Sequence, residues 1–277
     1  MGPLGYDDAF LTYELAPPSP SPSPSPAGDE DGVVLDYVHF TVGMHPMRRL
    51  AWWVAWNIDG LTLYPSDSIS RSGQRFKLDP RLRVDQQAGE AVYADNDLDR
   101  GHVARRSDLL WGATLEEALQ ANSDSFFFTN VTPQRAGFNQ SGRGGVWGLL
   151  ENAVLALDGL ADRRLSVFAG PVLADADPSY RDLVQLPREF WKVVVYRVVD
   201  ELRFKAFLLT QNLDGIEPLL PDVDDEFLDD FDTYLVGLDV LEDRTGLTFD
   251  GLRDVAGPAG LRSASPQLVT AVEDIDW

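Results

Sequence analysis

Residues 99–102 read Asp-Arg-Gly-His, and a set of polar side chains follows them along the chain. Asn130 opens the run Asn-Val-Thr-Pro-Gln, Asn139 lies in Phe-Asn-Gln, and Glu151 follows Trp-Gly-Leu-Leu. Metal-assisted hydrolysis of a phosphodiester needs a base for water, a neutral oxygen ligand for the cation and a carboxylate near the cation's waters. The histidine, the asparagines and the glutamate supply these groups within one short stretch. The stretch therefore predicts a hydrolytic site that acts on phosphodiesters.

The composition is that of a folded protein. The chain has 277 residues, 44% of them hydrophobic, which is enough for one large domain or two small ones. It has no cysteine, so disulfides and thiolate metal sites are excluded. No apolar run reaches the roughly 18–20 residues of a membrane span, so we expect no membrane partner. Residues 1–8 lack the basic and apolar regions of a signal peptide, and both a cytoplasmic and an exported location stay open.

The net charge of −22 has the wrong sign for a protein that binds phosphate backbones. Acidic residues crowd the run 222–232, which we interpret as a solvated acidic face because it lacks the spacing of an EF-hand calcium loop. Basic residues gather around the motifs: Arg71, Arg75, Lys77, Arg81, Arg83, Arg100, Arg105, Arg106, Arg135 and Arg143. This distribution is compatible with a local basic cleft on an acidic body.

The chain divides into three parts. Residues 17–27 are almost entirely proline and serine, a composition that favours an extended polyproline conformation. We therefore expect an N-terminal arm at 1–16, a Pro/Ser-rich spacer at 17–32 and a folded domain at 33–277. The arm holds apolar side chains that can dock back on the domain: Phe10, Leu11, Tyr13 and Leu15.

Apolar periodicity predicts an α+β fold. Alternating apolar and polar residues and short apolar runs are typical of strands. We expect strands at 34–42, 50–58, 165–169, 191–199 and 202–211, with turns at Asp59-Gly60 and Gly170-Pro171. We expect helices at 115–120, 147–157 and 233–245, of which the second carries an apolar stripe. This pattern predicts a central antiparallel sheet flanked by helices.

The order of the motifs resembles the DNA/RNA non-specific endonuclease family, the ββα-metal or His-Me finger nucleases. The resemblance runs from about Val33 to about Leu252. It includes Gln-Arg-Phe-Lys-Leu-Asp-Pro at 74–80 and Val-Phe-Ala-Gly-Pro-Val at 167–172. The resemblance implies a ββα-metal nuclease fold and an enzyme that hydrolyses phosphodiester bonds.

The resemblance also implies roles for the matched residues. His102 would be the general base that deprotonates the attacking water. Asn139 would be the one direct protein ligand of Mg²⁺, with Mn²⁺ as the other possible ion. Glu151 would hold waters bound to that ion. Arg75 would contact the phosphate through its planar guanidinium.

Further matched residues would support this site. Asn130 would brace it or position the substrate, and Asp99 and Arg100 would support the segment that carries the base.

Several of these residues also have an ordinary structural interpretation. An asparagine before a helix often caps it, and a glutamate on a helix usually faces solvent. Arg75 can form an ion pair with Asp79. Packing roles are expected for His39, His45, Trp111 and Trp147.

The chain departs from the family pattern between Asn139 and Glu151, where residues 141–146 lengthen the connection. A continuous helix would hold the two residues about 18 Å apart, from the rise of 1.5 Å per residue, too far to share one ion. The glycines in this segment disfavour such a helix, so we expect a loop at 141–145 whose Arg143 can reach a phosphate.

A second departure is an arginine that some relatives carry one helical turn after the glutamate. This chain has Leu155 there. Arg100, Arg105 or Arg135 can substitute for it.

These observations predict a Mg²⁺-dependent endonuclease that cuts DNA and RNA by in-line attack of water, with little sequence preference, leaving 5′-phosphate and 3′-hydroxyl ends. One alternative is a catalytically silent nuclease-fold binding module, which the acidic charge favours. Another is a toxin-type nuclease held by an inhibitor protein. A homodimer is possible, and the preference between DNA and RNA stays open.

Overall fold

The computed structural model describes residues 4–21, 32–156, 164–199, 201–216, 231–253, 266–272 and 275–277. Its largest element is an eight-stranded antiparallel sheet with the strand order β14-β12-β11-β10-β7-β4-β3-β2. The strands are β2 (Val34–Tyr37), β3 (Phe40–Met44), β4 (Ala51–Asp59), β7 (Arg164–Val172), β10 (Glu189–Val198), β11 (Glu201–Thr210), β12 (Thr233–Val236) and β14 (Gln267–Leu268). The structure thus confirms the α+β class and the central antiparallel sheet.

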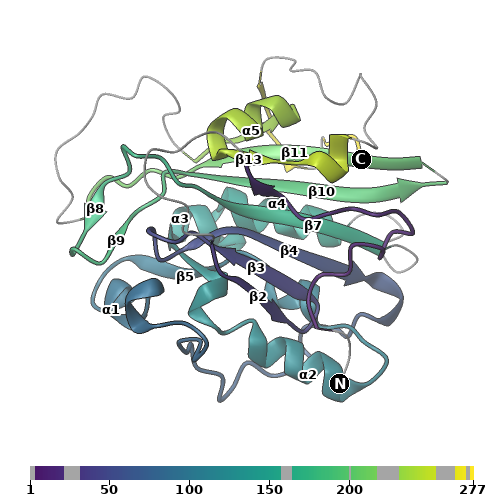
Figure 1. Ribbon diagram of the computed structural model, residues 1–277, viewed down its shortest axis with the longest axis horizontal. Coiled ribbons are helices and arrows are strands. Elements are labelled where there is room, and N and C mark those ends of the chain that lie inside the picture. Colours follow the sequence, from purple (N-terminus) through teal and green to yellow (C-terminus); the bar gives the residue numbers. More distant parts are fainter. Residues whose placement is uncertain are drawn as a thin grey trace.

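Smaller elements surround this sheet (Figure 1). The helices are α1 (Glu90–Tyr93), α2 (Leu115–Asp124), α3 (Ala136–Asn139), α4 (Val146–Leu155) and α5 (Leu238–Thr245). The short 3₁₀ helices are η1 (Gly60–Thr62), η2 (Val84–Gln86), η3 (Arg106–Leu109), η4 (Phe128–Asn130) and η5 (Ser141–Arg143). The remaining strands form pairs: β1 (Ser19–Pro20) with β13 (Leu247–Thr248), β5 (Leu98–His102) with β6 (Val131–Arg135), and β8 (Ser179–Tyr180) with β9 (Val184–Gln185). None of the described helices is long and apolar enough to cross a membrane.

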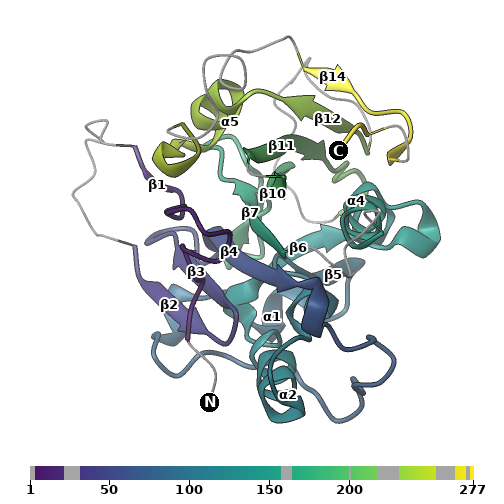
Figure 2. The same cartoon turned by 90° about the vertical axis from the view of Figure 1, so that its right-hand side faces the viewer.

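The sheet is covered on both faces (Figure 2). On one face, α4 places Trp147, Leu150 and Val154 in the same buried cluster as Trp56 and Val194. The other face is covered by α5 and by the N-terminal segment. Because successive side chains of a strand point to opposite faces, each central strand contributes to both layers.

The N-terminal segment packs on the second face. Phe10, Leu11 and Leu15 are buried there, and the Tyr6 hydroxyl donates a hydrogen bond to the Leu15 carbonyl. β1 then pairs with β13, so the start of the Pro/Ser-rich stretch is extended and lies along the body. These contacts account for Phe10, Leu11 and Leu15 of the arm, whereas Tyr13 is exposed. The division into 1–16, 17–32 and 33–277 stays a prediction.

Three sequence expectations for this sheet are wrong. Residues 34–42 form the hairpin β2–β3 instead of one strand, with His39 in the left-handed region at φ 73°. The buried His39 ring stacks on Trp111, with ring centroids 3.5 Å apart, and interacts with Glu117, which stabilises a turn that has no glycine or asparagine. His39 therefore serves packing, as expected, and Trp111 is half-buried against it.

The expected helix at 233–245 begins later. Residues 233–236 form β12, which adds to the edge of β11, and only Leu238–Thr245 is helical. Long-range pairing with β11 overrides the local pattern here.

The expected stop at Gly170-Pro171 is also wrong. β7 continues to Val172, and Pro171 lies opposite Phe190 of β10. The ladder from β7 to β4 ends at Ala169, so the missing N–H of Pro171 interrupts no pairing on that side.

The remaining strands and helices lie where the apolar periodicity predicted them, although their ends are shifted. The strands 51–59, 189–198 and 201–210 and the helix 146–155 are present, and α2 extends to Asp124. Residue 157, at the end of the expected stripe of α4, lies outside the described residues, as does most of the acidic run 222–232.

Candidate active site

The matched motifs meet at one strand–strand–helix unit. β5 ends with Asp-Arg-Gly-His at 99–102 and pairs antiparallel with β6, which begins one residue after Asn130. Helix α3 follows β6 directly, ends at Asn139 and contacts both strands. α4 packs on α3 and carries Glu151. This order of elements is a ββα unit.

Gly101 of this unit is fixed by packing. A Cβ atom at this position would lie 1.9 Å from Oε1 of Gln134 on the paired strand. Gln134 is fully buried, and both polar atoms of its side chain lack hydrogen-bond partners among the described residues. The Gln134 side chain occupies the space that a Cβ atom at position 101 would need, which explains why glycine stands between Arg100 and His102.

Asp99 orients the Asn139 side chain. Nδ2 of Asn139 donates to Oδ2 of Asp99 at 3.0 Å, and Nε2 of Gln140 donates to the same oxygen at 2.7 Å. With its nitrogen engaged, the Asn139 amide keeps its oxygen for another partner. An oriented amide oxygen is a suitable ligand for a hard divalent cation.

No continuous helix runs from Asn139 into α4, as expected. Residues 141–143 form a 3₁₀ turn, and Gly144 takes the left-handed conformation at φ 79°. α4 then begins at Val146 and approaches α3 closely, since a Cβ at Gly148 would lie 2.6 Å from the Asn139 carbonyl oxygen. The expected break is confirmed, although a short 3₁₀ helix replaces an irregular loop.

Glu151 is buried in a cluster of charges instead of facing solvent. Its Oε1 lies 3.4 Å from Nζ of Lys192, and its Oε2 lies 3.6 Å from Nε of Arg105. Arg105 also donates to the side-chain oxygen of Asn152 at 2.7 Å. Among the arginines proposed to replace the missing one, Arg105 is thus the one that contacts Glu151, whereas Arg100 pairs with Glu90.

His102 lies at the end of β5 with a half-buried ring. The ring packs between Phe76 and Phe126, with centroids 5.4 Å from each, and its Nε2 is buried with no hydrogen-bond partner in the described part of the chain. Burial, together with the charges of Arg71 and Arg106, lowers the pKa of His102 to about 3. The imidazole is therefore neutral at pH 7, the form that can accept a proton.

His102 and Asn139 are connected through β5. Asp99 of β5 accepts the hydrogen bond from the Asn139 amide, and His102 is the last residue of the same strand, three residues further along. Hydrogen bonds between His102 and either Asn139 or Glu151 are absent from the described residues. The convergence of His102, Asn139 and Glu151 around one cation stays a prediction.

The Asn130 side chain makes hydrogen bonds that hold neighbouring backbone in place. Its Oδ1 accepts from the Ala104 amide at 2.9 Å, and its Nδ2 donates to the carbonyls of Ala104 and Ser125. The side chain is fully buried, so these bonds hold the segment that follows His102. Of the two roles expected for Asn130, bracing is the one that these contacts support.

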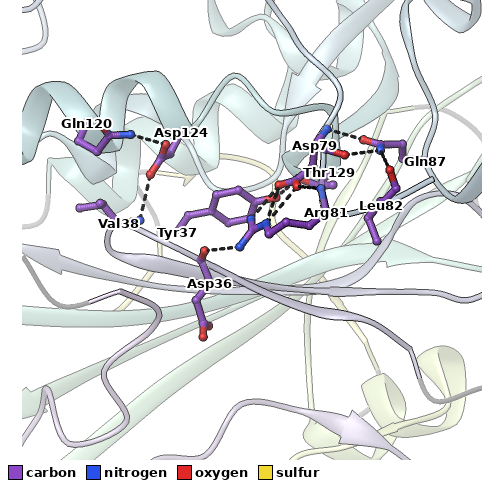
Figure 3. A network of polar contacts seen from close by, with 10 residues as sticks. All are labelled: Asp36, Tyr37, Val38, Asp79, Arg81, Leu82, Gln87, Gln120, Asp124 and Thr129. Atoms are coloured by element: carbon purple, nitrogen blue, oxygen red, sulfur yellow. Dashed lines mark hydrogen bonds and ion pairs between the residues drawn. The ribbon is translucent and has the colours of Figure 1, made fainter. Parts of the chain in front are cut away.

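Arg75 is exposed, and its side chain makes no ion pair or hydrogen bond with the described residues. Its alternative interpretation as the partner of Asp79 is wrong, because Arg81 occupies that position at 2.7 Å. Figure 3 shows Asp79 at the centre of a network with Tyr37, Thr129 and Arg81, which fixes the segment around Arg75 to β2 and η4.

The sequence interpretation assigned no specific role to Arg71 or Lys192, and it named Arg105 as one of three candidates to replace the missing arginine. Arg71 is exposed, yet its charge acts on His102, and its guanidinium lies 5.9 Å from the Phe126 ring. Lys192 carries a signal that was available in the sequence: one lysine in a long apolar strand, in register with the core-facing side chains. Arg71 and Arg105 carry no such signal, because their partners are distant in sequence.

The donor set fits a divalent cation that prefers oxygen. No group of at least three His, Asp or Glu side chains converges within the described ranges, so a cation here would depend on the Asn139 oxygen and on water. Glu151 would be the carboxylate available to such waters.

The fold and this unit define the class of ββα-metal nucleases. The solved structure of the EndoG/EndoGI complex, described as showing the mechanism of EndoG inhibition, contains a chain of the same fold. It aligns with a TM-score of 0.58 and 20% identity, covering 83% of this chain and 93% of that one.

Sequence relatives agree with this class. A protein named Nuclease from Nostoc sp. is 26% identical over 235 residues, which cover 84% of this chain and 75% of the relative. Nuclease C1 of Cunninghamella echinulata is 25% identical over 261 residues, covering 87% and 93%. Uncharacterized protein y4fB of Sinorhizobium fredii is 34% identical over 222 residues, but the matched region spans 32% of that longer protein and 75% of this chain.

The family model for DNA/RNA non-specific endonucleases matches residues 18–254. The chain therefore belongs to the DNA/RNA non-specific endonuclease family, and it falls in the nuclease class of hydrolases. Membership makes a divalent cation the expected cofactor.

Proposed function

We propose that this chain is a Mg²⁺-dependent endonuclease that hydrolyses phosphodiester bonds within DNA and RNA with little sequence preference. The observation that carries the proposal is the Asn139 amide, whose nitrogen is held by Asp99 while its oxygen is left for a cation. The strand that carries Asp99 ends at His102, a neutral imidazole with an unpartnered nitrogen among the described residues.

His102 would act as the general base. An unpartnered imidazole nitrogen can accept the proton of a water molecule, which then attacks phosphorus in line with the leaving 3′-oxygen. The lowered pKa keeps the ring unprotonated at neutral pH, while it also weakens the ring as a base. The products would be 5′-phosphate and 3′-hydroxyl ends.

Asn139 and Glu151 would hold the cation and its waters. When bound, Mg²⁺ or Mn²⁺ would stabilise the charge that develops on the phosphate and on the leaving oxygen. Asp99 keeps the Asn139 amide in one orientation, and Asn130 fixes the backbone that follows His102. These side chains would thereby keep the base and the cation ligand in a fixed relation.

Exposed arginines would bind the substrate. Arg71, Arg75 and Arg143 are exposed, and no ion pair to a described carboxylate engages them. Guanidinium groups match phosphate oxygens and do not select bases, which supports cleavage with little sequence preference. Many of the other basic side chains form ion pairs with neighbouring carboxylates. The positively charged surface that binds the substrate would therefore be small.

An inhibitor protein and a second copy of the chain are the two partners of this proposal, and a second candidate function is kept beside them. EndoG, which shares this fold, is inhibited in its complex with EndoGI, and we infer that an inhibitor protein could cover the corresponding site here. A silent binding module remains the second candidate function, favoured by the net charge of −22. Homodimer formation stays a prediction that light scattering can test.

Digestion of supercoiled plasmid and of single-stranded RNA tests the proposal. We expect cleavage with Mg²⁺ or Mn²⁺, none with a chelator, and a loss of about 10²–10⁴-fold in His102→Ala. Asn139→Ala should lose comparable activity. His45→Ala, a histidine that packs near Trp52, is the matched control and should cut normally. Wild-type protein that binds but never cuts would support the silent module instead.

A further inference from the structure

We propose that Lys192 is a positioning residue that, together with Arg105, holds the Glu151 carboxylate in place for the waters of the cation. This inference rests on the proposed function, because it assigns Lys192 a task at the same site. It concerns a residue that touches neither the phosphate nor the cation directly.

Lys192 lies in the middle of β10 and is 1% exposed. Its side chain enters the layer between the sheet and α4, where its Nζ lies 3.8 Å from the ring centroid of Trp147 and 5.6 Å from that of Trp56. The same Nζ lies 3.4 Å from Oε1 of Glu151. An ammonium group is thus buried between two indole rings with its charge directed at one carboxylate.

Packing does not explain a lysine at this position. Removal of a charged pair from water is costly, and replacement of buried ion pairs by apolar residues of similar size is often neutral or stabilising. The neighbours of Lys192 on the same face of β10, Phe190 and Val194, are apolar and fully buried. Apolar residues in place of both Lys192 and Glu151 would serve the packing at least as well, so packing alone does not account for this charged pair.

The geometry around Glu151 supplies a reason for the pair. Lys192, from the sheet, faces Oε1, while Arg105, from the segment that follows His102, faces Oε2. Two cations from different elements therefore hold the carboxylate from both sides. Arg105 additionally binds Asn152, the next residue of α4, so the helix is tied to the strand that carries His102.

Asp108 completes this buried cluster. Its Oδ2 accepts a hydrogen bond from Nε1 of Trp56 at 3.2 Å, and its charge acts on Glu151, Lys192 and Arg105. Burial raises the pKa of Asp108 to about 7, so near neutral pH this carboxyl carries only part of a negative charge, and Glu151 is the carboxylate that Lys192 and Arg105 contact. The carboxylate stays available to waters while its position is fixed.

Loss of Lys192 should weaken binding of the cation, and because it leaves the buried Glu151 with Arg105 as its remaining cationic partner, it should also lower stability. Residues that orient the ligands of a metal typically contribute 10- to 100-fold to affinity or activity. Lys192→Met removes the charge and keeps the approximate shape of the side chain. Lys205→Met, on the adjacent strand β11, is the matched control because Lys205 has no contact with Glu151 in the structure.

The test compares Lys192→Met, Glu151→Gln and the double variant with wild-type protein. Mn²⁺ binding without nucleic acid is measured by electron paramagnetic resonance, and kcat and KM are measured on a DNA duplex. We expect Lys192→Met to keep its cooperative unfolding transition, to bind Mn²⁺ about 10- to 100-fold more weakly and to lose kcat with little change in KM. The double variant should bind and cut no worse than Glu151→Gln.

Normal Mn²⁺ binding and kcat in Lys192→Met would overturn the inference, as would losses that multiply in the double variant. Should Lys192→Met fail to fold, Lys192→Gln retains a hydrogen-bond donor to Glu151 and is measured in the same way. In that variant, weaker Mn²⁺ binding together with a lower kcat would support the positioning role, and normal values of both would overturn it.

Failure of the proposed function has a different signature. If wild-type protein neither binds Mn²⁺ nor cuts DNA, the function is wrong and the positioning role falls with it. If wild-type protein does both and Glu151→Gln loses both, an unaffected Lys192→Met removes only the role of the lysine.

Discussion

The two faces of the central sheet are buried in different ways, and β10 shows the difference within one strand. Toward α5 and the N-terminal segment it presents Trp191, Val193 and Val195, all apolar and buried. Toward α4 it presents Lys192, which meets Glu151. Apolar burial suffices to explain these three side chains. The second face keeps a charged pair where apolar packing would be possible, so we infer that function has shaped it.

The largest effect that would test this comparison concerns stability on the first face. Leu15 of the N-terminal segment is fully buried, so Leu15→Ala should lower the free energy of unfolding by about 2–5 kcal/mol in urea titrations. Cleavage measured well below the unfolding transition should be unchanged. Leu4→Ala, at a position that is 62% exposed, should alter stability by less than about 0.5 kcal/mol. A loss of activity in folded Leu15→Ala would show that the two faces are not separable.

Substitution of Gly148, on the second face, should lower catalytic activity, in contrast to Leu15→Ala. A Cβ at Gly148 would lie 2.6 Å from the Asn139 carbonyl oxygen, so Gly148→Ala must displace α4 from α3. We expect kcat to fall by up to about 10²-fold, because small misplacements of a catalytic group have large effects. Gly142→Ala is the control, since a Cβ there meets nothing within 4 Å. Equal activity of the two variants would contradict the role of this close contact.

A smaller effect is expected from the exposed cations. Arg71→Ala should reduce the slope of log affinity against log salt by about 1, if Arg71 contacts one phosphate. Binding to catalytically silent His102→Ala protein at several salt concentrations measures this slope. Arg83→Ala should leave it unchanged, because Arg83 is paired with Asp85. An unchanged slope in Arg71→Ala together with a reduced slope in Arg83→Ala would place the bound substrate elsewhere.

The last prediction concerns the titration of His102. The pKa of His102 is lowered to about 3, so the folded protein resists protonation of this ring while the unfolded chain accepts a proton near pH 6.5. Its contribution to stability is thus present above about pH 6.5 and is lost as the pH falls toward 3. Nuclear magnetic resonance should show the His102 ring unprotonated down to about pH 5. A midpoint near 6.5 would contradict the burial of the ring.

Some features of both faces were accessible from the sequence. The pairing of 189–198 with 201–210 and the apolar stripe of α4 follow from local periodicity, and the order of the motifs indicated the ββα unit. The break between Asn139 and α4 was predictable because glycine disfavours helix.

Other features depend on partners that are distant in the chain. The turn at His39 is stabilised by Trp111 and Glu117, and β12 exists because β11 offers a free edge. Glu151 was expected at the cation's waters, but its contacts with Lys192 and Arg105 join three separate elements. Local propensity carries no information about such contacts.

Cleavage by this chain would depend on one amide oxygen, oriented by Asp99, that holds the divalent cation. An anomalous difference map from crystals soaked in Mn²⁺ shows directly where such a cation binds. We expect a peak bonded to Oδ1 of Asn139, with Glu151 reached through water, and no such peak in crystals of Asn139→Ala. A Mn²⁺ ion bound elsewhere, with Asn139 Oδ1 free of metal, would contradict this role of the amide.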